Sequence, residues 1–172
     1  MDLEQELLKK QTLLQCNRII KYIGVNEMRF GELMKIFFKG EYRLTQHAAR
    51  PMSYCIQKHP FLAKPYFKKF IDHLSDEQTH PAVKRNIVRL FQFVEIPKKY
   101  QGKLMEKCFQ FINNPAEAVA VKAFSLHILE NLGEIYPEIL PEVKTIIETR
   151  WEFETPAFRS RAGKILKRYK DF

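Results

Sequence analysis

The hydrophobic residues of this chain recur at intervals of three and four, which is the spacing of an amphipathic α-helix. The stretch AVKRNIVRLF, residues 82–91, is a clear example, because its apolar positions fall on one side of a helix and its three basic residues on the other. Similar segments follow one another along the chain, and none of them alternates convincingly in the manner of a strand. The sequence therefore predicts an all-α protein of about nine helices.

Three of the predicted helices repeat one pattern without gaps. AVKRNIVRLF begins at Ala82, AVKAFSLHIL at Ala120 and AFRSRAGKIL at Ala157, at intervals of 38 and 37 residues. Each segment has a basic residue at its third position and ends on two apolar residues. A fixed period of this length is typical of repeat proteins, in which each repeat packs on its neighbours.

A second series of helices lies between the first three and starts at Pro60, Pro97 and Pro137. We therefore expect two kinds of helix to alternate, in a single domain over residues 1–172. The predicted elements are one long N-terminal helix over 3–23 and helix pairs over 26–58, 60–94, 97–132 and 137–170. Pro51 is expected to kink or restart the second helix of the first pair.

Three of the predicted helix starts combine a residue that can cap a helix with a proline in the first turn. The proline lacks an N–H group where none is needed, and the preceding side chain can accept a hydrogen bond from the first turn. The predicted combinations are Thr79 with Pro81, Asn114 with Pro115, and Thr155 with Pro156.

This period, with two helices in each repeat, resembles the HEAT-like repeat family. The resemblance covers residues 26–172, and it includes the early basic residue of the second helices at Lys84, Lys122 and Arg159. HEAT repeats also carry an Asp between the paired helices, which is matched here only at Asp72 or Asp76. The resemblance implies an α-α superhelix, as in small bacterial proteins of this shape, with the second helices on its concave face.

The net charge of +9 over 172 residues favours anionic partners. If the second helices line a concave face, their basic residues form a groove there; the predicted members are Arg50, Lys84, Arg85, Arg89, Lys122, Arg159 and Arg161. In the alternative, these residues are a solvated face that pairs between repeats with Glu130, Glu134, Glu138 and Glu142. Arg85 and Arg89 stand apart, because the next repeat has Ala123 and His127 in their places.

The sequence favours a non-enzymatic binding or scaffold module whose groove receives an acidic protein segment. The alternative is nonspecific binding of nucleic acid in the same groove. The architecture resembles that of HEAT-like alkylpurine DNA glycosylases, which need a catalytic Asp framed by aromatic residues. Trp151, the single Trp, is instead surrounded by glutamates, and none of the four Asp residues is near it in the sequence. We therefore expect no glycosylase activity.

No motif for a cofactor, a metal or a nucleophile is recognisable in the sequence. The five His residues form no HExxH pattern, and there is no CxxC pair or Gly-rich phosphate loop. The odd number of cysteines, Cys16, Cys55 and Cys108, indicates buried thiols in a reducing compartment. The acidic start MDLEQELLKK differs from a secretory signal, and no apolar run approaches the roughly 18 residues of a membrane span. We expect a cytoplasmic protein with no cofactor, no metal and no membrane contact.

Overall fold

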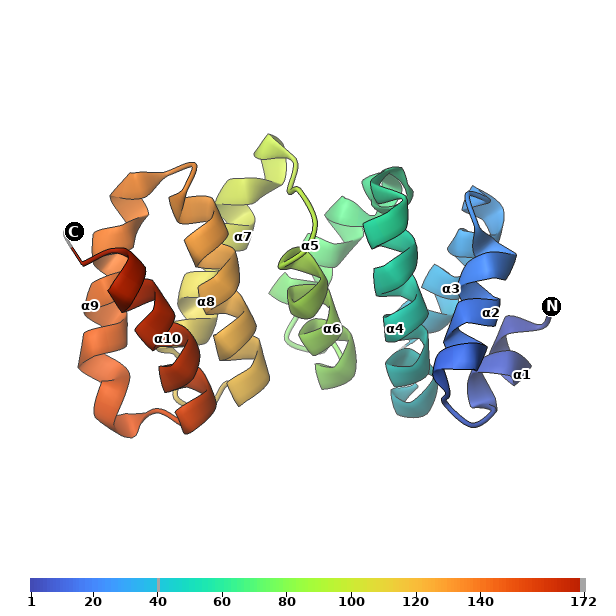
Figure 1. Ribbon diagram of the computed structural model, residues 1–172, viewed down its shortest axis with the longest axis horizontal. Helices are drawn as coiled ribbons and strands as arrows, with labels where there is room; N and C mark the ends of the chain where they lie inside the picture. Colours follow the sequence, from blue (N-terminus) through green and yellow to red (C-terminus); the bar gives the residue numbers. More distant parts are fainter. Residues whose placement is uncertain (40, 171–172) are drawn as a thin grey trace. The chain divides into compact units, whose positions relative to one another are not determined.

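The computed structural model describes residues 1–39 and 41–170, and all regular structure in these residues is helical (Figure 1). The α-helices are α1 (Leu3–Leu8), α2 (Leu13–Ile23), α3 (Glu27–Lys39), α4 (Tyr42–Lys58), α5 (Phe67–Ser75), α6 (Pro81–Phe91), α7 (Lys98–Asn113), α8 (Val119–Gly133), α9 (Leu140–Arg150) and α10 (Pro156–Arg168). Short 3-10 helices are η1 (Pro60–Tyr66), η2 (Pro137–Ile139) and η3 (Trp151–Phe153). The predicted all-α fold class is confirmed.

The chain divides into two compact units: unit 1 is Met1–Val94 and unit 2 is Glu95–Phe172. The four predicted helix pairs are α3 with α4 and α5 with α6 in unit 1, and α7 with α8 and α9 with α10 in unit 2. The single domain over 1–172 stays a prediction.

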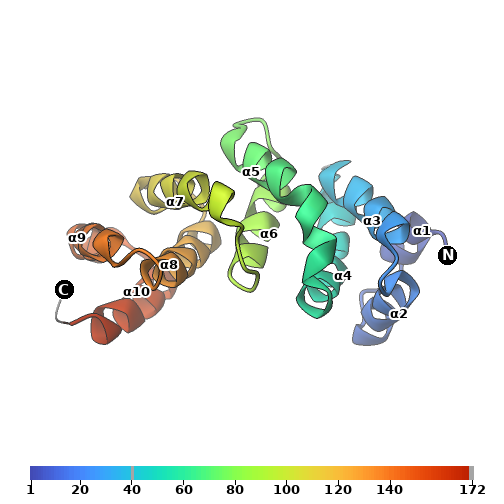
Figure 2. The ribbon, with the colours of Figure 1, turned by 90° about the horizontal axis from the view of Figure 1, so that it is seen from above.

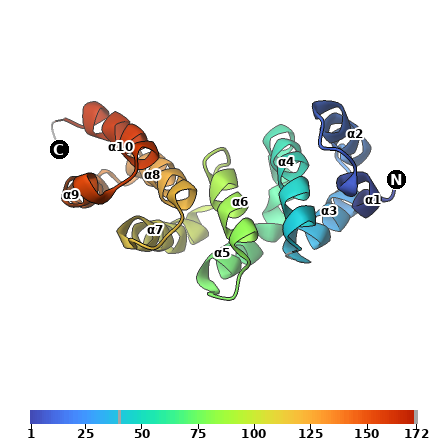
Figure 3. The ribbon, with the colours of Figure 1, turned by 90° about the horizontal axis from the view of Figure 1, so that it is seen from below.

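Unit 1 is built in two layers (Figures 2 and 3). Helices α3 and α5 lie in one layer, and α2, α4 and α6 lie side by side in the other. Helix α4 packs against α3 and also against its layer neighbours α2 and α6. The interior between the layers is rich in aromatic rings: Phe70 lies 5.8 Å from Phe91 and 5.6 Å from Phe38, measured between ring centroids. Phe70 and Phe91 therefore form core in this unit, whereas Phe93 is 54% exposed.

Unit 2 is centred on α8, which contacts α7, α9 and α10. Helix α8 is apolar on most of its circumference because it is covered on several sides, and Leu126, Ile128 and Leu129 are completely buried. Phe158 of α10 is also completely buried.

The repeated pattern lies where the sequence predicts it. Ala82, Ala120 and Ala157 are each the second residue of a helix, namely of α6, α8 and α10. These three helices are the second members of their pairs, so the period and the alternation of two helix types are confirmed. The first members that start at Pro60 and Pro137 open with the 3-10 helices η1 and η2.

The prediction of one long N-terminal helix over 3–23 is wrong. The chain forms α1 and α2 instead, because the backbone becomes extended at Lys9 and Thr12 caps a new helix. The hydroxyl of Thr12 accepts a hydrogen bond from the backbone N–H of Gln15 at 3.1 Å. Pro51 does not restart the helix, since α4 runs from Tyr42 to Lys58 with Pro51 inside it.

Of the three predicted helix caps, only Thr155 is confirmed, where the hydroxyl accepts from the backbone N–H of Phe158 at 3.4 Å. At α6 the capping group is the His80 ring, whose Nδ1 accepts from the backbone N–H of Ala82 at 3.1 Å, and not Thr79. Asn114 does not start α8 but ends α7, and α8 begins at Val119. Asn114 accepts instead from the backbone N–H of Ala116, which closes a local turn.

Candidate binding surface

The layer of α2, α4 and α6 in unit 1 contains no acidic residue, although every neighbouring α-helix of the unit contains at least one. The basic residues of the layer are Arg18, Lys21, Arg43, Arg50, Lys58, Lys84, Arg85 and Arg89. Unit 1 as a whole has 16 basic and 9 acidic residues, whereas unit 2 has 13 and 11. Most of the net charge of the protein is therefore in unit 1.

Helix α4 exposes one continuous stripe. Arg43, Arg50, Tyr54 and Lys58 follow one another at intervals of seven, four and four residues, and all four are exposed. This spacing places them on one side of a helix, away from buried residues such as Met52. The guanidinium of Arg50 lies 5.8 Å from the centroid of the Tyr54 ring, within the range of a cation–π contact.

Helix α6 adds two arginines one turn apart. Arg89 is exposed and Arg85 is half-buried, while Ile87 on the opposite side is completely buried. In the described part of the chain, no carboxylate lies within ion-pair distance of these two arginines or of Arg43 and Arg50. We call these four arginines of α4 and α6 the basic face.

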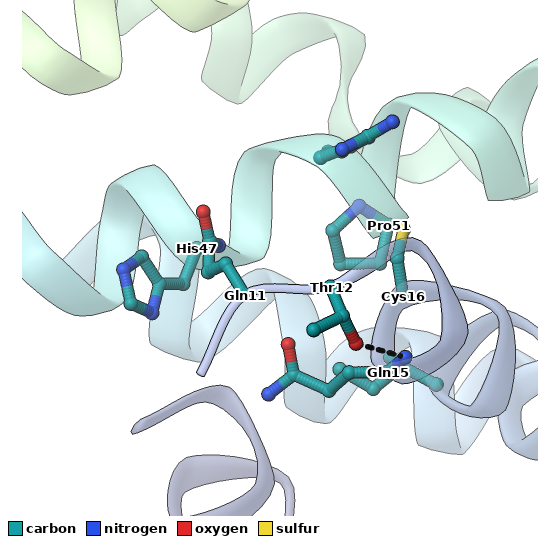
Figure 4. Close-up of a pocket in the computed structure, with 8 residues that line it drawn as sticks. Gln11, Thr12, Gln15, Cys16, His47 and Pro51 are labelled. Carbon is teal, nitrogen blue, oxygen red and sulfur yellow. Dashed lines mark hydrogen bonds between the residues drawn. The ribbon is translucent and has the colours of Figure 1, made fainter. Parts of the chain in front are cut away.

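A small hollow lies beside the basic face, between α2 and α4 (Figure 4). Thr12, Gln15, Cys16 and His47 are among its lining residues, and its volume is about 10 Å³. That volume holds one water molecule at most. Burial raises the pKa of the Cys16 thiol, so the thiolate form that reacts with electrophiles is disfavoured there. The hollow is too small for a larger ligand.

Lys122, a predicted groove residue on α8, is buried in the core of unit 2 and is 4% exposed. Its Nζ donates to both carboxylate oxygens of Glu154 at 2.8 Å, and Arg150 of α9 donates to the same carboxylate from Nη2 at 2.6 Å. Burial alone would raise the pKa of Glu154, but the hydrogen bonds from the two cations hold that pKa below its ordinary value. Lys122 is therefore an internal ion-pair partner and not an exposed groove residue.

Other basic residues of unit 2 pair between helices α10 and α8. Arg161, also a predicted groove residue, forms an ion pair with Glu130, and Arg168 reaches Glu130 at 3.4 Å and Glu134 at 2.6 Å. Burial lowers the pKa of the Arg161 guanidinium. For Arg161, then, the structure has the ion pair with Glu130 that the sequence left open as the alternative, whereas Lys122 pairs with Glu154, which the sequence analysis did not name.

The predicted site residues fall into two groups. Arg50, Lys84, Arg85 and Arg89 lie on α4 and α6 of unit 1, while Lys122, Arg159 and Arg161 lie on α8 and α10 of unit 2. Arg159 is half-buried near the start of α10. A groove that joins residues of both units stays a prediction.

The sequence reasoning missed Arg43 and the absence of acids from the whole layer. A signal was available, because residues 42–71 contain no Asp or Glu.

A hollow of about 220 Å³ in unit 1 lies at the end of α3 and the turn between α5 and α6. There His73 stacks on Phe38 with ring centroids 4.8 Å apart, and its Nδ1 lies 3.1 Å from the hydroxyl oxygen of Thr79. Burial lowers the pKa of His73. Among the described residues, no group of three or more His, Cys, Asp or Glu is arranged to hold a metal ion.

The thiols of Cys55 and Cys108 are both buried, and burial raises the pKa of each to about 12. They are free cysteines, and at neutral pH they stay protonated.

In the part of the chain that the structure describes, none of the helices combines the length and the apolar composition that a membrane span requires.

The alternating helix pairs and their packing define a helical repeat protein. The chain belongs to the HEAT repeat family, because the model of the HEAT repeat domain matches residues 3–169. HEAT repeats are helical scaffolds that typically have no catalytic activity. Comparison with curated proteins and with solved structures gave no match.

Proposed function

We propose that the protein is a non-enzymatic binding module and that its basic face in unit 1 receives an acidic protein segment. The observation that carries the proposal is a layer of three packed helices with eight basic and no acidic residues. Four of the arginines have no carboxylate partner among the described residues. Like charges that lie close together repel one another, and an anionic partner removes that repulsion.

The choice of basic residue favours a recognition surface over a merely solvated one. Of the six arginines in unit 1, five are in this layer, but only three of its ten lysines are. Protein interfaces are enriched in Arg and Tyr and depleted in Lys, whereas a solvated surface needs no such bias. Tyr54, which is 39% exposed, lies within the stripe of α4. A helical solenoid also offers an extended surface of the kind that suits a long peptide.

The proposal is tested by fluorescence anisotropy with a labelled Glu- and Asp-rich peptide and, separately, a labelled DNA duplex. The variant Arg85→Glu/Arg89→Glu reverses two charges of the basic face. The control Lys35→Glu/Lys64→Glu makes the same change of net charge on α3 and η1, where both lysines are exposed. We expect the first variant to bind the peptide at least about tenfold more weakly, and the control to bind like wild type.

Two results would contradict this proposal. Equal losses in the two variants would mean that only net charge matters and that the basic face is not a site. Duplex binding that falls steeply with salt, combined with no peptide binding, would favour the nucleic-acid alternative.

A further inference from the structure

Unit 2 has a charged surface of the opposite sign on α9 and the 3-10 helices at its two ends. Glu138, Glu142, Glu148 and Glu152 are exposed there, at intervals of four, six and four residues. Val143, Ile146 and Ile147 are buried on the other side of α9. Within the described residues, none of the four carboxylates has an ion-pair partner. We call these four glutamates the acidic face.

We propose that the acidic segment received by the basic face is the acidic face of a second copy of this chain. The inference rests on the proposed function and names its partner. Four unpaired carboxylates then meet four unpaired guanidiniums, which bind carboxylates in a bidentate manner.

Exposed apolar side chains lie beside the acidic face and in the layer that holds the basic face. Phe153 follows the acidic face directly and is 86% exposed. The layer of the basic face exposes Tyr54 on α4 and Leu14, which is 72% exposed, on α2. Exposed ion pairs contribute little by themselves, so a specific contact needs apolar area of this kind in addition.

The two faces are different surfaces of one chain, and each copy offers one of each. Two copies can therefore pair reciprocally in a two-fold dimer, or several can join head to tail in a closed ring or an open chain. The association is therefore expected to grow with protein concentration and to weaken with salt.

Sedimentation velocity over a range of protein concentrations tests the inference. Wild type should form species larger than a monomer at about 50 mM NaCl and should be monomeric at about 500 mM, where the Debye length is a few ångströms. Arg85→Glu/Arg89→Glu and Glu142→Lys/Glu148→Lys should each be monomeric alone. Mixed together, they should form a 1:1 dimer and nothing larger, because the mixture contains only one intact pair of faces.

Two control variants separate the effect of altering a face from the effect of changing the net charge. Lys35→Glu/Lys64→Glu and Glu32→Lys/Glu77→Lys change the charge by the same amounts at exposed positions of unit 1 outside both faces. Both controls should associate like wild type. The inference is overturned if wild type is monomeric at low salt, or if Glu142→Lys/Glu148→Lys associates as wild type does.

The failure of this inference is distinguishable from the failure of the proposed function. If wild type stays monomeric but binds the acidic peptide through Arg85 and Arg89, the second copy is not the partner and the proposed function stands. If the peptide does not bind either, both are wrong.

Discussion

At the scale of single residues, Glu154 shows how unit 2 uses its positive charge. The carboxylate is nearly inaccessible and is held by Lys122 of α8 and Arg150 of α9, which joins two helices to the turn before α10. A buried carboxylate with two cations is stable only while its partners remain, since an unpaired charge in the core is costly.

Lys122→Met should therefore destabilise the protein by about 2–4 kcal/mol at pH 7. The loss of both cations would cost more, because Arg150 still pairs with Glu154 in this variant. The free energy of unfolding from urea titration measures this effect. Lys167→Met, at an exposed position of α10, is the control and should change stability by less than about 0.5 kcal/mol. Equal stability of Lys122→Met and wild type would show that the pair is not important for folding.

The same pair determines the sign of the pH dependence. The folded-state pKa of Glu154 lies below its unfolded value, so the stabilisation is complete above the unfolded pKa of about 4.3. It is lost as pH falls through the folded pKa. The stability difference between wild type and Lys122→Met should accordingly shrink below about pH 4.3.

The sequence locates Lys122 in the repeat but does not show its burial. The equivalent Lys84 and Arg159 are half-buried, so the repeat position alone does not determine exposure. What differs is the presence of Glu154, which lies 32 residues further along the chain and approaches only when α8 and α10 pack.

At the scale of helices, the period and the alternation follow from the sequence because apolar spacing and prolines are local signals. The ends of helices are less predictable. Thr79 and His80 are adjacent candidates to cap α6, and the Thr79 hydroxyl lies beside His73 of α5 while the His80 ring caps the helix. The break between α1 and α2 depends in the same way on packing, because Gln15 donates to the backbone carbonyl of Glu6.

Two glycines within helices should respond in opposite ways to alanine. A Cβ at Gly102 of α7 meets no atom within 4 Å, so Gly102→Ala should stabilise the protein by about 0.5–1 kcal/mol through helix propensity. A Cβ at Gly133, the last residue of α8, lies 2.5 Å from Cδ2 and 3.0 Å from Cγ of the buried Leu140. Gly133→Ala should destabilise by about 1–2 kcal/mol, because the buried Leu140 side chain at the start of α9 must shift. Thermal unfolding of both variants tests the two predictions. A Gly133→Ala variant more stable than wild type would contradict the close packing of Gly133 against Leu140.

At the scale of the whole molecule, the charge is divided between units in a way that composition does not reveal. The value of +9 suggested one basic groove along the chain. In unit 2 the cations Lys122, Arg150, Arg161 and Arg168 bind carboxylates of the same unit, and in unit 1 the basic face has no such partners. For Lys122, Arg161 and Arg168 the pairing depends on contacts between residues 31–38 positions apart, and a single sequence does not contain that information.

The two compact units should also unfold separately, because each has its own buried core. Trp151, the only Trp, lies in unit 2 near Gly163 of α10, so its fluorescence reports that unit alone. Far-UV circular dichroism reports the helices of both units. In Gly133→Ala, the fluorescence midpoint should fall, while part of the dichroism signal keeps the wild-type midpoint and belongs to unit 1. A single transition that shifts equally in both probes would contradict separate unfolding and would support the single domain that the sequence predicts.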